Sequence, residues 1–122
     1  DHQANARLVN AAQGKPVTFH RAFDEVIDYT SALEEVIELG CSAILTSGAK
    51  KSALKGVERL NQLLHLADQR IEIIIGGGIR SGNISELKQA LNANFYHSAC
   101  ITQPGGDADE SEIKRILEVF QQ

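Results

Sequence analysis

Residues 16–24, PVTFHRAFD, decide how the rest of this 122-residue chain is interpreted. The segment begins with β-branched and aromatic residues, which favour a strand. It then runs directly into His20, Arg21 and Asp24. A base, a cation and an acid therefore follow the first predicted strand.

The same design recurs three times, at residues 44–48 (ILTSG), 73–80 (IIIGGGIR) and 95–100 (FYHSAC). Each segment is a short apolar run that ends in polar or glycine residues. Apolar residues at helical spacing predict five helices, which lie between these segments and at both ends of the chain. Their approximate ranges are residues 2–13, 31–39, 52–67, 83–91 and 109–120. The alternation predicts a single α/β unit over residues 1–122, with four parallel strands and helices outside; a flavodoxin-like doubly wound sheet is the alternative.

Two predicted helices carry the pattern of a capping box at their start. Ser31 is followed by Glu34, and Asn83 is followed by Glu86. In a capping box the first side chain accepts a backbone N–H of the first turn. We therefore expect these helices to begin at Ser31 and Asn83.

Composition and charge narrow the function. The chain is 43% hydrophobic, which suits one globular core, and its formal charge is −4, which argues against a nucleic-acid or anionic-membrane partner. No apolar run approaches the length of about 18 residues that a membrane span requires, so we expect a cytoplasmic protein. Because the chain has no methionine and begins at Asp1, we expect a fragment or a processed product.

Strand alternation suggests where chemistry can occur. Thr18 and His20 share one side of their strand, and Phe95 and His97 share one side of theirs. Both histidines can thus project toward one mouth, although each also fits a purely structural histidine. With Asp24, they are our candidate catalytic residues, for acid–base work on a small molecule.

The remaining polar strand ends are candidate ligand-binding residues. The glycine run leaves N–H groups unobstructed, and Arg21 and Arg80 can hold a carboxylate or phosphate. The same glycines also suit a tight strand-to-helix turn, and strand-end hydroxyls often bond to nearby backbone. The complete set of candidates is Arg21, Thr46, Ser47, Gly77, Gly78, Arg80 and Ser98.

These motifs resemble the C-terminal half of the CutC family of copper homeostasis proteins. The resemblance rests on TFHRAFD (18–24), LTSG (45–48), GGGIRSGNI (76–84) and the histidine and serine at 97–98. It implies a (β/α)8 barrel, in which these strands are the fifth to the eighth. The chain is therefore expected to be half of such a barrel.

Copper is implied by the resemblance alone. Cuprous ion prefers thiolate and thioether ligands, yet the chain has only Cys41 and Cys100 and no methionine. Cys41 precedes its strand and Cys100 follows its own, so the two are expected at opposite ends of a parallel sheet. No residue is assigned to a metal, and no cofactor is identified.

Three functions stay open on the sequence. The first is a CutC-like cytosolic protein of copper homeostasis with a small-molecule site at the strand ends. The second is an aldolase- or isomerase-like barrel enzyme acting on a phosphorylated metabolite, and the third is a non-catalytic scaffold. A small anion is the expected ligand. Because half a barrel exposes two strand edges, we expect a homodimer or pairing with a missing N-terminal half.

Overall fold

The structure is a computed structural model that describes all residues, 1–122. Four strands alternate with helices, as the sequence predicts. The strands are β1 (Thr18–Phe19), β2 (Ala43–Thr46), β3 (Glu72–Ile75) and β4 (Phe95–Tyr96). The helices are α1 (His2–Ala11), the 3₁₀ helix η1 (Arg21–Glu25), α2 (Tyr29–Glu38), α3 (Val57–Ala67), α4 (Ile84–Ala90) and α5 (Glu110–Phe120).

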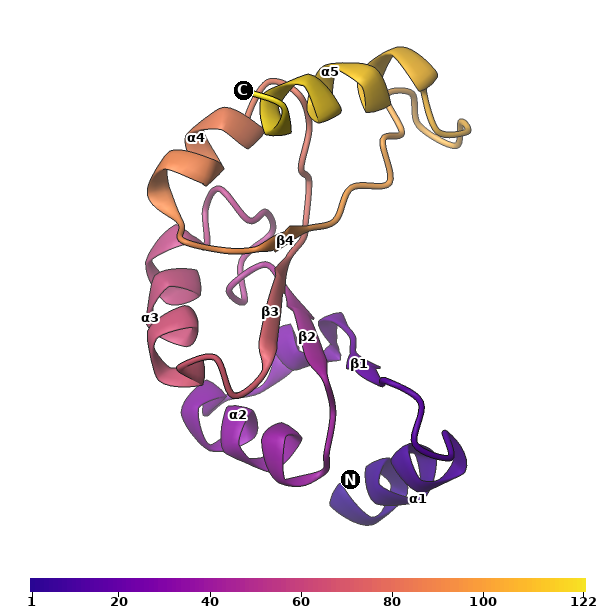
Figure 1. Cartoon of the computed structure of the whole chain (residues 1–122), viewed down its shortest axis with the longest axis vertical. Helices are drawn as coiled ribbons and strands as arrows, with labels where there is room; N and C mark the ends of the chain where they lie inside the picture. Colours follow the sequence, from indigo (N-terminus) through magenta and orange to yellow (C-terminus); the bar gives the residue numbers. More distant parts are fainter.

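The strands form one parallel sheet in which they pair in chain order, β1-β2-β3-β4. A flavodoxin-like sheet has a different order, with a reversal at a switch point. In Figure 1 the strands line the concave side of a crescent, α2, α3 and α4 cover its convex side, and α1 and α5 lie at its two tips. This is the α/β architecture of half a (β/α)8 barrel.

Both predicted capping boxes are wrong in detail. Asp28 caps α2, because its carboxylate accepts the backbone N–H groups of Thr30 and Ser31, each at 3.1 Å. Asn83 is the N-cap residue of α4, but its side-chain oxygen accepts the backbone N–H of Arg80 at 2.9 Å instead of capping the helix. Ser31 lies inside α2, and its hydroxyl donates to the Asp28 carboxylate at 2.7 Å.

The two faces of the sheet differ in burial. Ile44, Ile73 and Ile75 face the helices and are at most 2% exposed. On the concave face, Leu45 pairs with Ile74 in the register of β2 and β3, and both side chains are only half-buried. The predicted strand alternation therefore holds through the centre of the sheet.

The hydrophobic core is confined to the middle of the chain. Its 16 buried residues run from Phe23 to Leu91, and none belongs to α1, β1, β4 or α5. No helix combines the length and the apolar character needed to cross a membrane.

Candidate functional site

The predicted site residues follow the carboxyl ends of the four strands, which meet at one end of the parallel sheet. Arg21 and Asp24 lie in η1, directly after β1. Ser47 follows β2, Gly77 and its neighbours follow β3, and His97 follows β4. The polar contacts between these ends decide which side chains are free to meet a ligand.

Asp24 is the centre of a network that joins the first two strand ends. Its side chain is only 7% exposed. One carboxylate oxygen accepts the Thr46 hydroxyl at 2.5 Å and the Ala49 backbone N–H at 3.1 Å. The other accepts Nε of Arg21 at 2.9 Å and lies 3.1 Å from the Ser47 hydroxyl. Through these hydrogen bonds, Asp24 of η1 holds the end of β2 and the loop after it in place.

The network also sets the charge state of Asp24. Burial raises the pKa of this carboxyl, but hydrogen bonds from Thr46, Arg21 and the backbone outweigh burial and leave the pKa below its ordinary value. Hydrogen bonds to the charged form favour that form. The geometry favours a positioning role for Asp24, and its acid–base role stays a prediction.

The two histidines are separate from this acid. Nδ1 of His20 accepts the backbone N–H of Ala22 at 2.9 Å and caps η1. His97 is anchored through its backbone N–H, which donates to the carbonyl of Ile75 at 2.8 Å. Both histidines are exposed. The structure brings neither into hydrogen-bond contact with Asp24, so any catalytic role for them rests on other partners.

Arg21 links the network to the third strand end. Its Nη2 donates to the Ser47 hydroxyl at 2.8 Å and lies 3.5 Å from the Lys50 carbonyl oxygen. The guanidinium carbon is also 3.5 Å from the point that a Cβ atom on Gly77 would occupy. That Cβ would lie 2.8 Å from Cβ of Ser47, and φ of Gly77 is +107°. Only glycine fits this approach of the β3 loop to the first two strand ends.

The glycine run carries unpaired donors. The Gly77 carbonyl accepts the Ala53 backbone N–H at 2.9 Å. By contrast, the N–H groups of Gly77, Gly78 and Ile79 have no hydrogen-bond acceptor in the chain. Buried backbone N–H groups are nearly always paired; among these three residues Ile79 is buried, at 1% exposed, whereas Gly77 is half-buried and Gly78 is exposed. This part of the β3 loop therefore has the capacity to bind an acceptor.

Arg80, the cation that the sequence placed beside the glycines, is engaged elsewhere. Its Nη1 donates to the Ile79 carbonyl at 2.6 Å, and its Nη2 donates to the Ile101 carbonyl at 2.8 Å. The Ser98 hydroxyl donates to the same Ile79 carbonyl at 2.7 Å and accepts the Cys100 N–H at 3.0 Å. Arg80 and Ser98 thus hold the β4 loop against the β3 loop.

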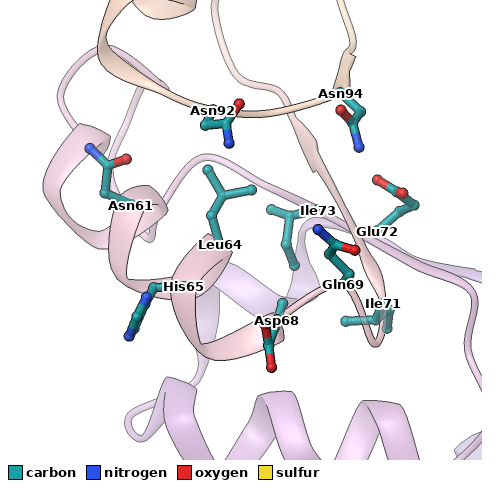
Figure 2. A pocket seen from close by; sticks show the side chains of 11 residues that line it. Asn61, Leu64, His65, Asp68, Gln69, Ile71, Glu72, Ile73, Asn92 and Asn94 are labelled. Carbon is teal, nitrogen blue, oxygen red and sulfur yellow. The ribbon is translucent and has the colours of Figure 1, made fainter.

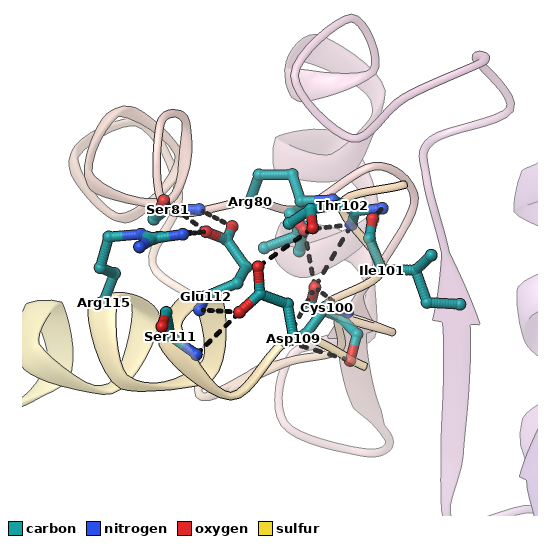
Figure 3. A network of polar contacts seen from close by, with 11 residues as sticks. Arg80, Ser81, Cys100, Ile101, Thr102, Asp109, Ser111, Glu112 and Arg115 are labelled. Carbon is teal, nitrogen blue, oxygen red and sulfur yellow. Dashed lines mark hydrogen bonds and ion pairs between the residues drawn. The ribbon is translucent and has the colours of Figure 1, made fainter. Parts of the chain in front are cut away.

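Glu112 of α5 also binds the β3 loop, a contact that was not predicted from the sequence (Figure 3). Its side chain is 4% exposed. It accepts the Ser81 backbone N–H at 2.6 Å, the Ser81 hydroxyl at 2.8 Å and Nη2 of Arg115 at 2.9 Å. The Ser81 N–H is the main cause that holds the pKa of Glu112 below its ordinary value. The sequence contained one indication of this role. Glu112 is a charged residue four positions before Ile116, so it lies on the buried side of α5, where an unpaired charge is rare.

Two surface cavities lie near opposite ends of the sheet. One, of about 610 Å³, adjoins the β3 and β4 loops and is lined by Arg80, Ser81, Glu112 and residues 101–104. The other, of about 410 Å³, lies between the end of α3 and the segments that precede β3 and β4 (Figure 2). Only the first contains a residue from the predicted site, Arg80.

The cysteines do not share a site. Cys41 precedes β2 and Cys100 follows β4, so they lie toward opposite ends of the parallel sheet. Both are free and buried, and burial raises the pKa of Cys41. No three His, Cys, Asp or Glu side chains come together as metal ligands.

A parallel sheet in chain order, with polar loops converging at its carboxyl ends, defines the class: half of a (β/α)8 barrel with a candidate strand-end site. Comparison with known proteins gives the family. The model of the CutC family matches residues 1–102, and the chain belongs to that family.

Individual relatives agree with this assignment. The chain is 36% identical to the family protein CutC of Xanthomonas campestris pv. campestris (strain B100) over 135 residues, which cover 99% of this chain and 56% of the relative. It is 48% identical to the Vibrio cholerae serotype O1 protein over 92 residues, covering 75% of this chain and 36% of the relative.

A solved structure agrees as well. The candidate copper homeostasis protein CutC from Streptococcus agalactiae matches with a TM-score of 0.74 and 30% identity. The match covers 80% of this chain and 48% of that one. The chain thus spans about half the length of the relatives that it matches most fully.

Proposed function

We propose that this chain supplies a small-molecule site at the strand ends of a cytosolic CutC-type barrel that takes part in copper homeostasis. The ligand that suits the site best is a small anion, such as a phosphate or carboxylate group. The observation that carries the proposal is the run of three backbone N–H groups without an acceptor in the chain, at Gly77, Gly78 and Ile79, with the guanidinium of Arg21 close to Gly77.

The chemistry of these groups supports an anion. Successive backbone N–H groups form concave sites for anions without any side chain. Arg21 adds a positive charge whose guanidinium carbon lies 3.5 Å from the Cβ position of Gly77. Asp24 offsets part of that charge but also fixes the guanidinium in place through a 2.9 Å ion pair. The cation of the proposed site is thus Arg21, whereas Arg80 maintains the loop.

The test is a titration with inorganic phosphate at constant ionic strength, followed by amide NMR. We expect shifts at Gly77, Gly78 and Ile79. Arg21→Gln should weaken binding about tenfold, or about 1.4 kcal/mol, because the charge is removed. Arg7→Gln changes the net charge equally on the exposed face of α1 and is the control. Equal weakening by both variants, or no shift at millimolar phosphate, would contradict the proposal.

The same donors favour a second candidate function, an aldolase- or isomerase-like enzyme that acts on a phosphorylated metabolite. In (β/α)8 barrels, phosphate is frequently held by the loops after the seventh and eighth strands. If β3 corresponds to the seventh strand, its loop is in that place. His20 and His97 would then be the acid–base candidates, because both are exposed at strand ends. Turnover of a sugar phosphate that is lost in His97→Ala would favour this function.

The role in copper homeostasis is proposed from the family alone. The donors present do not fit a tight cuprous site within one chain, since the two thiols lie toward opposite ends of the sheet. We therefore expect loose Cu(I) binding in competition with a cuprous chelator. A tight one-to-one complex that disappears in Cys100→Ser would contradict this expectation.

A further inference from the structure

The loop after β2 carries a second run of backbone N–H groups without an acceptor in the chain. The N–H groups of Lys50, Lys51 and Ser52 form no hydrogen bond, whereas those of Ala49 and Ala53 on either side are both bonded. Lys50 and Lys51 are exposed and Ser52 is half-buried, so this stretch lies at the surface. The loop after β2 therefore repeats the feature that carries the anion site in the loop after β3.

The two runs of donors lie side by side. The Ala53 N–H, directly after the first run, donates to the carbonyl of Gly77 at 2.9 Å. A Cβ atom on Gly78 would lie 3.5 Å from Cβ of Ser52, which is ordinary van der Waals contact. Residues 50–52 and residues 77–79 are thus parts of one continuous surface at the strand ends.

Arg21 lies close to both loops. Its guanidinium carbon is 3.5 Å from the Cβ position of Gly77, and its Nη2 lies 3.5 Å from the carbonyl oxygen of Lys50. The carboxylate of Asp24, which fixes Arg21, is 7% exposed and already accepts hydrogen bonds from Thr46 and from the backbone. A fixed cation is therefore held beside both sets of donors, while the acid that holds it is shielded from a ligand.

The charge of these two loops is opposite to that of the chain as a whole. The chain has 16 acidic and 12 basic residues, yet no Asp or Glu occurs at residues 39–57 or 73–85. Lys50, Lys51 and Lys55 lie in the first of these stretches, and none of them forms an ion pair. Because no carboxylate of the loops neutralises the lysines, their charges attract an anionic ligand to the strand ends.

We propose that residues 50–52 form a second phosphoryl subsite beside the proposed anion site, on which this inference rests, and that the ligand carries a diphosphate group. Residues 77–79 hold one phosphoryl group, and residues 50–52 hold the other with the ammonium groups of Lys50 and Lys51. Lysine binds phosphate as a point charge, and successive backbone N–H groups form concave anion sites. The direct contact between the loops favours a diphosphate, whose two phosphoryl groups share a bridging oxygen, over a ligand in which a carbon chain separates them.

The test compares pyrophosphate with orthophosphate in titrations at constant ionic strength, followed by amide NMR. Pyrophosphate should bind at least about tenfold more tightly and shift the amides of both runs, because it gains charge-assisted hydrogen bonds at the second subsite. Equal affinity for the two anions, or pyrophosphate shifts confined to residues 77–79, would overturn the second subsite and leave the anion site intact. The absence of shifts at residues 77–79 with either anion would contradict both.

Paired substitutions separate the second subsite from general charge. Lys50→Gln combined with Lys51→Gln should weaken pyrophosphate binding about tenfold or more, while orthophosphate binding at residues 77–79 changes by less than about twofold. Arg7→Gln combined with Lys15→Gln removes the same charge at exposed positions before β1, and should change neither affinity. Equal weakening of pyrophosphate binding by the two pairs would overturn the proposal. So would equal weakening of both anions by the lysine pair.

Discussion

The middle of the chain and its two ends are built from the same βα pattern but are held together differently. β2 and β3 are four residues long, and all 16 residues of the core lie between Phe23 and Leu91. β1 and β4 are two residues long, and α1 buries no residue. α5 adds no residue to the core, and its Glu112 accepts hydrogen bonds from Ser81.

The difference shows that a repeated local pattern does not give repeated burial. A central βα unit has a neighbour on both sides and can bury both flanks. A terminal unit buries only one flank, so the same apolar stripe stays partly exposed. Local opening should therefore begin at α1 and α5, while α2 to α4 unfold together.

The largest expected effect contrasts two leucines. Leu63 of α3 is fully buried, so Leu63→Ala should reduce the free energy of unfolding by about 2–5 kcal/mol. Leu117 of α5 is 52% exposed, so Leu117→Ala should change it by less than about 0.5 kcal/mol. Urea unfolding of both variants measures the contrast. Similar losses would show that the ends are as well packed as the middle.

The next effect concerns the close packing of loops in the middle. A Cβ atom on Gly56 would lie 1.9 Å from the Ser47 carbonyl oxygen, whereas one on Gly82 would meet nothing within 4 Å. Gly56→Ala should cost about 1–3 kcal/mol through overpacking. Gly82→Ala is the control and should be close to neutral. Thermal unfolding of both variants measures the difference. If Gly56→Ala leaves the free energy of unfolding unchanged, the loop after β2 can move to accommodate the methyl group.

A charge test addresses the fastening of β2 to η1. Asp24→Asn should cost about 1–3 kcal/mol at pH 7, because the buried donors lose their charged acceptor. Glu25→Gln, an exposed neighbour without a hydrogen bond, is the control.

The pH dependence of this effect has a definite sign. Because the pKa of Asp24 is lowered in the folded chain, its contribution to stability is present above its unfolded value of about 4 and is lost as the pH falls through the folded pKa. The difference between wild type and Asp24→Asn should therefore shrink on acidification below about pH 4. A difference that grows instead would contradict the lowered pKa.

The smallest expected effect is local to one end. Glu112→Gln weakens the attachment of α5 to Ser81, so amide exchange in α5 should accelerate about tenfold, corresponding to about 1.4 kcal/mol of local opening. Exchange in α3 should stay unchanged. Glu118→Gln, on the exposed face of α5, is the control. Faster exchange throughout the chain would mean that α5 unfolds with the core.

Much of the fold could be predicted from short-range patterns. The four strands and five main helices follow the spacing of apolar residues, and Ile73 and Ile75 are buried on one face as the alternation requires. The capping residues were harder to predict from the sequence. Asp28 rather than Ser31 caps α2, because the choice depends on which side chain lies within reach of the first turn.

The candidate site could be predicted only in outline. Parallel strand order places the polar loops at one end of the sheet, as expected. The sequence could not show that Asp24 contacts Thr46 instead of His20, or that Arg80 is bound to carbonyl oxygens. Thr46 is 22 positions from Asp24 and Ile101 is 21 positions from Arg80, so these partners meet only when the strand ends come together in the folded sheet.

The sequence by itself determined the α/β alternation, the strand ends that carry polar residues and the family, because each of these depends on residue types at short spacing. Only the tertiary structure decided that Arg21 lies beside Gly77, that Glu112 holds Ser81, and that the ends of the chain stay partly uncovered. The physical reason is the separation along the sequence of the residues that interact. Strand and helix patterns arise between residues two to four positions apart, whereas hydrogen-bond partners and burial are fixed by segments that meet only when the sheet forms.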